Sequence, residues 1–281
     1  KSIKWVRPGN GIKNIDIKKI IGKKLRVNVF ENQLIELKNI YDFLVPGYLG
    51  SDKYFYKTFI KPITKEQDKN QEKYLQKILH PLKLRRTKDQ VLEDLPSKVE
   101  DTRHCWLSEE QAEIYQSILS SHAKPIIDKL QDNKQTIPYF HIFSVLQLLK
   151  QVCNHPALVN NSSNWQQGES GKFEILKELV TEACEANKKI VIYSQYIGMI
   201  KIIENYLKSQ RIGYVSLTGR TTNRGEVIKK FHQDPEIKVF VGSLLAGGIG
   251  IDLTAASVVI HYDRWWNASK EAQATDRVHR I

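Results

Sequence analysis

Apolar residues in the first part of this chain recur at the spacing of a helix. Leu34, Leu37 and Leu44 lie on one face of a helical wheel, which predicts a helix over 31–44 that ends at Pro46. The spacing repeats every three to four residues, so one side of this helix should face a core.

Two further helices and a loop are predicted before residue 170. Ser108 followed by Gln111 matches a capping box and predicts the start of a helix over 107–122. The run HIFSVLQLLKQVC at 141–153 is mostly apolar and predicts a buried helix. The polar stretch 159–170 predicts a loop or linker.

Beyond residue 170 the pattern changes to short apolar runs that alternate with helical stripes. The runs predict strands at 190–193, 214–217, 239–241 and 258–262, with helices at 173–183, up to 206, at 225–231 and at 270–280. Strands and helices that alternate in this way predict an α/β fold with a parallel sheet covered on both faces. Ligands of such a sheet bind at the carboxyl ends of its strands.

The charge of the chain indicates a polyanionic partner. Lys and Arg number 43 against 31 Asp and Glu, which gives a net charge of +12 and a pI near 9.4. Nucleic acid is the usual partner for such a surplus, although a basic soluble protein with no such partner is the alternative.

Several other classes of protein are disfavoured by the composition. The three cysteines are odd in number and far apart, which argues against a disulfide framework, and they are too sparse to form a zinc site with the nearby histidines. No apolar run approaches the roughly 20 residues of a membrane span. We therefore expect no metal site and no membrane contact.

The predicted last helix carries candidate catalytic residues. Gln273, Arg277 and Arg280 are spaced four and three apart, so on a helix over 270–280 they share one face. Two guanidinium groups at the mouth of a parallel sheet suit phosphate recognition, and as arginine fingers they would neutralise charge on a transferred phosphoryl group. The alternative is an exposed basic helix with ordinary ion pairs.

Two segments near the strand ends are candidates for binding phosphates and nucleic acid. In GSLLAGGIGIDLTAA (242–256), Ser243 and the glycines, among them Gly247, allow close approach of a phosphate backbone, although a tight turn alone also explains them. In DRWWNAS (263–269), one of the two adjacent tryptophans can pack inward while the other faces a ligand, and burial of both is the alternative.

Two motifs of nucleotide-binding enzymes do not occur. The sequence contains no G-x-x-x-x-G-K-[ST] loop to hold the α- and β-phosphates, and no Asp-Glu pair at a strand end to hold magnesium. Arginine fingers without these elements cannot hydrolyse ATP with Mg²⁺, so we expect the other half of the nucleotide site to lie upstream or on another chain.

Together these segments resemble the second lobe of Swi/Snf-type ATPases of helicase superfamily two. The resemblance covers about 31–281 and implies a RecA-like sheet with helical insertions. It rests on the following motifs in order: ENQLIELKNIYDFLVPGYLG (31–50), PLKLRRTKDQVLEDLPSK (81–98), LSEEQAEIY (107–115), LKQVCNHPAL (149–158), SGKFEIL (170–176), YSQY (193–196), LTGRTTNRGEVIKKF (217–231), SLLAGGIGIDLTAA (243–256), HYDRWWN (261–267) and QATDRVHRI (273–281).

The resemblance implies a role for each matched position. Gln273, Arg277 and Arg280 would complete the ATP site, with Gly250 and Asp252 near the nucleotide. Expected DNA contacts are Ser194, Gln195, Gly219, Arg220, Ser243, Gly247 and Trp265. The implied partners are double-stranded DNA and the first motor lobe, and the implied state is a monomer. The motor would step along the minor groove of duplex DNA without separating its strands.

The resemblance also divides the chain and marks departures from the family pattern. It implies a degenerate remnant of the first lobe at 1–50, a helical region at 51–165 and the second lobe at 166–281. The family has Asn at the position of Asp252 and Pro at that of Ala268. Residues 1–30 lack the family's Leu-Thr-Gly-Thr-Pro run and its acidic box, which indicates a frame slip or a deletion there.

Three functions stay open at the level of sequence. The leading hypothesis is part of an ATP-driven double-stranded-DNA translocase, and the second is a catalytically dead fragment or DNA-binding module. The third is an RNA helicase or a strand-separating helicase. The expected location is the nucleoid-associated cytoplasm in a prokaryote, or the nucleus in a eukaryote.

Overall fold

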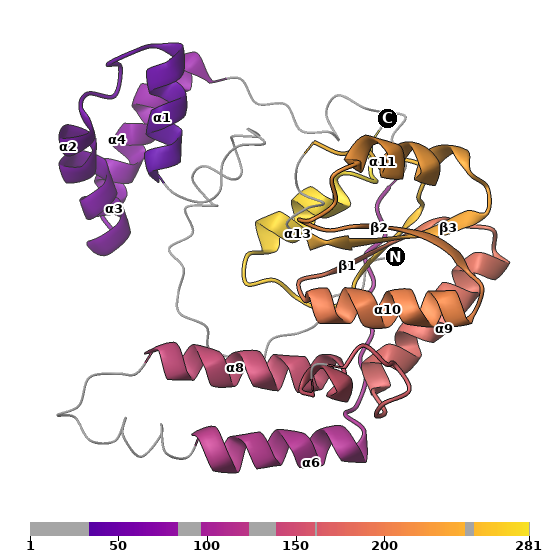
Figure 1. Cartoon of the computed structure of the whole chain (residues 1–281). Coiled ribbons are helices and arrows are strands. Elements are labelled where there is room, and N and C mark those ends of the chain that lie inside the picture. The colour runs from indigo at the N-terminus through magenta and orange to yellow at the C-terminus, as the bar shows by residue number, and fades with distance from the viewer. Residues whose placement is uncertain (1–33, 84–96, 124–138, 161, 245–249, 281) are drawn as a thin grey trace. The chain divides into compact units, whose positions relative to one another are not determined.

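The computed structural model describes residues 34–83, 97–123, 139–160, 162–244 and 250–280 (Figure 1). The chain forms two compact units, one within 7–94 and the other containing 95–281. None of the helices in these ranges is both long enough and apolar enough to cross a membrane.

The described part of the first unit is a small helical cluster with a core of its own. The buried side chains of Leu37, Phe55 and Phe59 meet there, which confirms the inward face predicted from Leu34 and Leu37. Leu44, which was predicted on the same face, is instead 64% exposed at the end of the helix. Ser51 and Asp68 cap the helices that follow them. The elements are α1 (Leu34–Leu44), α2 (Asp52–Phe55), the π-helix η2 (Tyr56–Ile60), α3 (Lys61–Lys65), α4 (Lys69–Leu79) and the 3₁₀ turn η3 (His80–Leu82).

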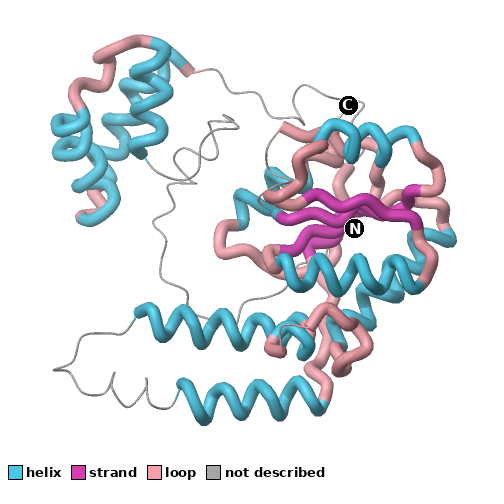
Figure 2. Tube along the Cα trace, in the orientation of Figure 1, coloured by secondary structure: helices cyan, strands magenta, loops and turns pink. Residues whose placement is uncertain are grey.

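The second unit is built on a four-stranded parallel sheet, as predicted (Figure 2). The spatial order is β2-β3-β1-β4, so the first strand lies inside the sheet and the last at one edge. The short β-branched runs formed strands because both faces of the sheet are covered. The strands are β1 (Ile190–Ser194), β2 (Gly213–Leu217), β3 (Ile237–Ser243) and β4 (Val258–His261).

Helices cover the two faces of the sheet with separate cores. Alternate residues of β1 point to opposite faces, so Ile190 and Ile192 pack with α9 and α10, whereas Val191 and Tyr193 pack with α11 and α13. The covering helices are α9 (Gly171–Glu185), α10 (Ile197–Ser209), α11 (Arg224–Gln233) and α13 (Ala268–Thr275).

A helical pair precedes the sheet in the same unit. α6 (Glu109–Ile118) begins at the predicted capping box of Ser108 and Gln111 and continues as the π-helix η4 (Leu119–Ala123). It lies beside α8 (Tyr139–Asn154), which ends at the 3₁₀ turn η5 (Pro156–Leu158) (Figure 1).

The prediction that α8 is a buried helix is wrong for one of its faces. Val145, Leu149 and Val152 are buried against α6, but Phe140 and Phe143 are 80% and 61% exposed. An apolar sequence is compatible with burial but does not specify how many neighbours the helix has. Within this unit α8 therefore presents an apolar stripe on its outer side.

Candidate functional site

The carboxyl ends of β1 and β3 lie next to each other. Ser194 and Ser243 are paired in register at these ends, and both are buried. Two of the expected DNA contacts therefore lie side by side at the edge of the sheet where ligands of parallel sheets bind.

A buried aspartate organises this edge. Asp263 follows β4, and its carboxylate accepts hydrogen bonds from the Ser194 hydroxyl and, at 2.9 Å, from the main-chain N–H of Gln195. Burial raises the pKa of Asp263, although these two hydrogen bonds act in the opposite direction. The Ser194 side chain is therefore engaged inside the protein, and its contact with DNA stays a prediction.

A second buried charge lies near Asp263 and was not predicted from sequence. Lys172 donates to the Asn154 side chain at 2.6 Å, and its ammonium lies 5.3 Å from the ring centroid of Tyr262. Burial lowers the pKa of Lys172 to about 8, and the charge of Asp263 offsets part of that fall. This cluster ties the end of α8 to the start of α9 and the end of β4.

The segment 264–266 is held from α13 by Glu271. One carboxylate oxygen accepts the main-chain N–H of Trp265 at 2.6 Å, and the other pairs with the Arg264 guanidinium at 2.9 Å. The Glu271 side chain is only 6% exposed. Glu271 thus holds the loop on the side that faces α13, and the Trp266 side chain lies on the exposed side.

The two tryptophans separate as adjacent residues on an extended chain should. Trp265 packs against the core on the α11 and α13 face, whereas Trp266 is 52% exposed. Lys150 of α8 lies 4.6 Å from the Trp266 ring centroid and donates to the Arg264 carbonyl at 3.1 Å. Trp265 is partly buried, so Trp266 is the more accessible of the two rings, and the predicted contact of Trp265 with DNA stays a prediction.

The prediction of one continuous helix over 270–280 is also wrong. α13 ends at Thr275, and the chain continues in tight turns in which Arg277 N–H bonds to the Ala274 carbonyl at 3.1 Å. The Thr275 hydroxyl bonds at 2.8 Å to a ring nitrogen of His261, a tertiary contact at the point where the helix ends. Gln273 is therefore on the helix, whereas both arginines follow it.

The two arginines still lie close enough to affect each other. Arg277 is 3% exposed and Arg280 is partly exposed. Burial lowers the pKa of Arg277, and the positive charge of Arg280 lowers it further. Two neighbouring guanidinium groups are suited to bind the oxygens of a phosphate group.

The predicted nucleotide-side residues meet this arginine segment. The Leu253 N–H donates to the Arg277 carbonyl at 2.9 Å, so the loop containing Gly250 and Asp252 lies beside it. Gly250 has φ +60°, a conformation that favours glycine, and Asp252 is exposed. Gly247 lies outside the described residues.

The turn after β2 is the most open of the predicted DNA contacts. Gly219 and Arg220 are both exposed, and the turn is closed by the Thr218 N–H, which donates to the Thr221 hydroxyl at 3.0 Å. Nothing lies within 4 Å of a Cβ placed on Gly219. Both residues are therefore accessible to a large ligand.

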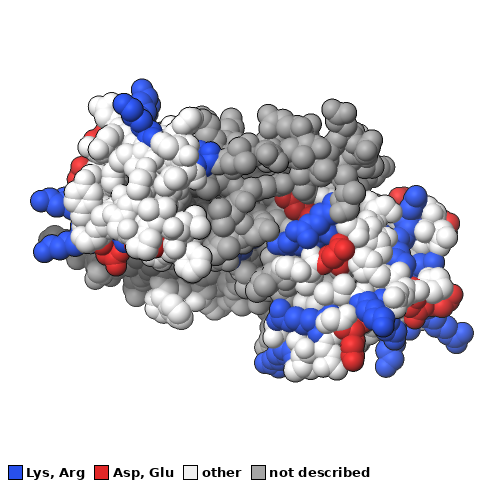
Figure 3. Space-filling model, turned by 90° about the horizontal axis from the view of Figure 1, so that it is seen from above, with Lys and Arg blue, Asp and Glu red and all other residues white. Residues whose placement is uncertain are grey.

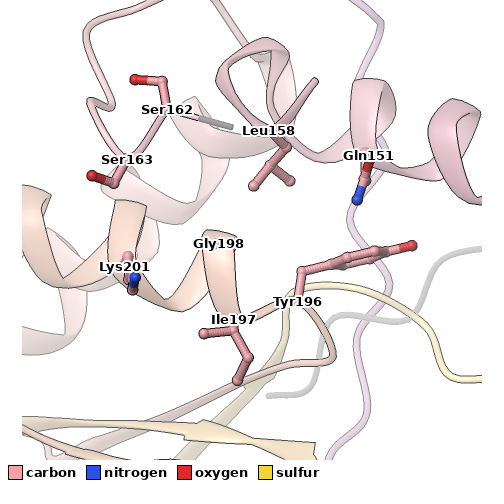
Figure 4. Close-up of a pocket in the computed structure, with 8 residues that line it drawn as sticks. All are labelled: Gln151, Leu158, Ser162, Ser163, Tyr196, Ile197, Gly198 and Lys201. Carbon is pink, nitrogen blue, oxygen red and sulfur yellow. The ribbon is translucent and has the colours of Figure 1, made fainter. Parts of the chain in front are cut away.

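A separate pocket of about 350 Å³ lies at the start of α10 (Figure 4). None of the predicted site residues lines it. Its walls are Gln151, Leu158, Ser162, Ser163, Tyr196, Ile197, Gly198 and Lys201.

Two family models match the chain. Residues 30–158 match the SNF2-related domain, and residues 171–281 match the helicase conserved C-terminal domain. Between them they cover both the helical segments and the sheet described above.

Known proteins with similar sequences come from bacteria and eukaryotes. The putative ATP-dependent helicase/translocase YwqA of Bacillus subtilis is 37% identical over 258 residues, which are 89% of this chain and 27% of that protein. The uncharacterized ATP-dependent helicase MG018 of Mycoplasma genitalium is 37% identical over 89% of this chain and 23% of its own length. This chain thus spans about a quarter of these relatives.

Solved structures from Sulfolobus solfataricus share the fold. The SWI2/SNF2 ATPase core in complex with dsDNA is 36% identical, with a TM-score of 0.55, over 89% of this chain and 52% of that one. The SWI2/SNF2 ATPase C-terminal domain is 34% identical, with a TM-score of 0.53, over 61% of this chain and 74% of that one.

Proposed function

This chain belongs to the SNF2 family of ATP-dependent helicases, and from that premise we propose that it supplies the second motor lobe of an ATP-driven double-stranded-DNA translocase. The observation that supports the proposal is the main-chain hydrogen bond from Leu253 to Arg277, which brings the 250–253 loop beside the arginine segment that follows α13.

On the ATP side, the arginine segment provides the phosphate contacts. Arg277 and Arg280 would hold γ-phosphate oxygens, and Gln273, Gly250 and Asp252 would lie beside the nucleotide. The repulsion between the two guanidinium groups is relieved when an anion binds between them. Bound ATP with Mg²⁺ supplies the phosphoryl group whose hydrolysis drives the motor, and we assign most of its binding to the first lobe.

On the DNA side, exposed groups at the same edge of the sheet provide the contacts. Arg220 is an exposed cation on an open turn, and the Trp266 ring is accessible beside Lys150. Cationic and main-chain donors of this kind position a phosphate backbone without reading its sequence. Ser194, Gln195, Ser243 and Gly247 are proposed as further contacts along the tracked strand. On the face shown in Figure 3, basic side chains are more frequent than acidic ones, which lie among them.

The division of the chain follows from the same family. We assign 1–50 to the end of a first lobe, 51–165 to the helical region of the family and 166–281 to the second lobe. The name of the Sulfolobus complex with dsDNA supports duplex DNA as the substrate.

The proposal is tested in a chimera in which this chain replaces the matching segment of YwqA. Arg280→Ala is expected to lower duplex-stimulated ATP hydrolysis by about 10³-fold or more, because arginine fingers contribute that much to the rate. Duplex binding should stay within about twofold, since the DNA-facing groups remain. Lys208→Ala, an exposed cation at the end of α10, is the matched control.

The chimera also separates the alternatives. Unchanged hydrolysis in Arg280→Ala would refute the finger assignment. A folded chimera that binds duplex DNA but hydrolyses no ATP would indicate a DNA-binding module without catalysis. Stimulation by RNA or single strands, with unwinding, would indicate a strand-separating helicase.

A further inference from the structure

Glu271 connects the two sides of the proposed site. Its side chain holds the loop that presents Trp266, and its own helix leads directly into the arginine segment. Its carboxylate accepts a hydrogen bond from the Trp265 N–H at 2.6 Å and pairs with the Arg264 guanidinium at 2.9 Å.

The burial of Glu271 indicates that these contacts hold the loop firmly. A carboxylate that is almost fully buried is costly unless it is paired and hydrogen-bonded. Removal of the carboxylate would leave the Trp265 N–H and the Arg264 charge without this acceptor. The loop would then lose these two polar contacts with α13, although Asp263 would still hold its other end to β1.

A second set of contacts continues from α13 toward Arg277. The Thr275 hydroxyl donates to the Glu271 carbonyl at 3.1 Å and lies 2.8 Å from the Nε2 of His261. The His261 ring stacks on Tyr193 with centroids 5.6 Å apart, and the charge of Arg277 acts on Tyr193. These contacts connect α13 with the ends of β4 and β1, where Tyr193 lies near the charge of Arg277.

We propose that Glu271 is a positioning residue that couples the DNA-facing loop 264–266 to the phosphate-facing arginines. The inference rests on the proposed function and names Glu271 as the residue that connects its DNA-binding part with its phosphate-binding part. Glu271 touches neither DNA nor nucleotide in this scheme. It makes the loop and α13 move as one body, so that DNA bound at the loop fixes the arginine segment.

Hydrogen–deuterium exchange of the full 281-residue chain tests this link without nucleotide. In Glu271→Ala, amides of both 264–267 and 276–280 should exchange at least about tenfold faster, because two tertiary contacts are lost. Glu271→Gln keeps an oxygen for the Trp265 N–H and should restore part of the protection at 276–280. Glu174→Gln, an exposed glutamate on α9, is the control and should change neither segment.

Faster exchange confined to 264–267 would overturn the proposal, since Glu271 would then act only on its local loop. If Glu271→Ala does not fold, Arg264→Ala provides the test instead. It removes the ion pair with Glu271 and keeps the hydrogen bond from the Trp265 N–H. It should loosen 276–280 as well, and unchanged exchange there would equally overturn the proposal.

Addition of duplex DNA separates this inference from the proposed function. In the unmodified chain, DNA should slow the exchange of both 264–267 and 276–280. In Glu271→Ala, DNA should slow the exchange of 264–267 only. If DNA changes exchange nowhere, the DNA-binding part of the proposed function fails. The comparison of the free variants still decides the role of Glu271.

Discussion

At the scale of single residues, Lys172 shows how the fold changes the chemistry of a side chain. Its ammonium is buried beside Asn154, Tyr262 and the Asp263 carboxylate, and its pKa falls to about 8 from 10.5. The native state therefore releases the proton of Lys172 at a lower pH than the unfolded chain does. Folding stability must then depend on pH through this residue.

Lys172→Met should remove the part of the pH dependence of the unfolding free energy that comes from the titration of Lys172. Between pH 8 and 10.5 the unfolded state binds more protons at this site, so the wild-type contribution to stability rises with pH, by at most about 3 kcal/mol. Below pH 8 both states are protonated and the contribution is constant. The gap in unfolding free energy between wild type and Lys172→Met should shift in favour of wild type from pH 7.5 to 9.5.

Chemical denaturation at several pH values measures this gap, with Lys201→Met as an exposed control. The charge of Lys172 also acts on the pKa of Cys105 and of Cys153, so the comparison is repeated in a background in which both cysteines are replaced by serine. Parallel curves for wild type and Lys172→Met would show that Lys172 is not held in the environment described.

Motifs in the sequence named candidate residues for this proposed site, but not the residues that hold those candidates in place. Arg277, Arg280 and Ser194 could be named from spacing and resemblance. Asp263 bonds to Ser194 across 69 positions of the chain, and Glu271 acts through buried contacts on a loop. Such pairs follow from tertiary packing, which periodicity does not encode.

At the scale of elements, the strands were predictable because both faces of the sheet are buried. A short β-branched run needs no knowledge of its neighbours to indicate such a strand. The end of α13 and the exposed face of α8 were mispredicted, because each depends on contacts with other segments. Thr275 meets His261, and α8 has α6 on only one side.

The two faces of α8 should respond differently to substitution. Val152→Ala removes methyl groups from a fully buried side chain and should cost about 2 kcal/mol of unfolding free energy. Phe143→Ala removes a larger but 61% exposed side chain and should cost less than about 1 kcal/mol. Thermal and denaturant unfolding of both variants measures the difference. A larger loss in Phe143→Ala would mean that the outer stripe is covered.

At the scale of the whole molecule, the net charge of +12 predicts DNA binding that weakens steeply with salt. Each phosphate contact should contribute about −0.9 to the slope of log K against log salt concentration, because bound counterions are released. Arg220→Ala should weaken binding of a duplex of any sequence and reduce the magnitude of that slope by about 1.

Fluorescence anisotropy with a labelled duplex over a range of salt concentrations measures these slopes. Lys208→Ala is the matched control, because it removes an equal charge near the amino edge of the sheet. Equal slopes for Arg220→Ala and wild type would remove Arg220 from the DNA contacts. Equal losses in both variants would indicate attraction by net charge alone.

The strand order has a consequence for how the protein is made. Ribosomes synthesise β1, β2 and β3 before β4, and these three strands can pair with one another before β4 joins β1. Asp263, Glu271 and both arginines follow β4 in the chain. During translation the nascent sheet therefore carries an open edge at β1, which is open to non-native pairing. The proposed phosphate-binding segment follows β4, so a nascent chain that stalls before β4 has three paired strands but lacks the residues of that proposed site.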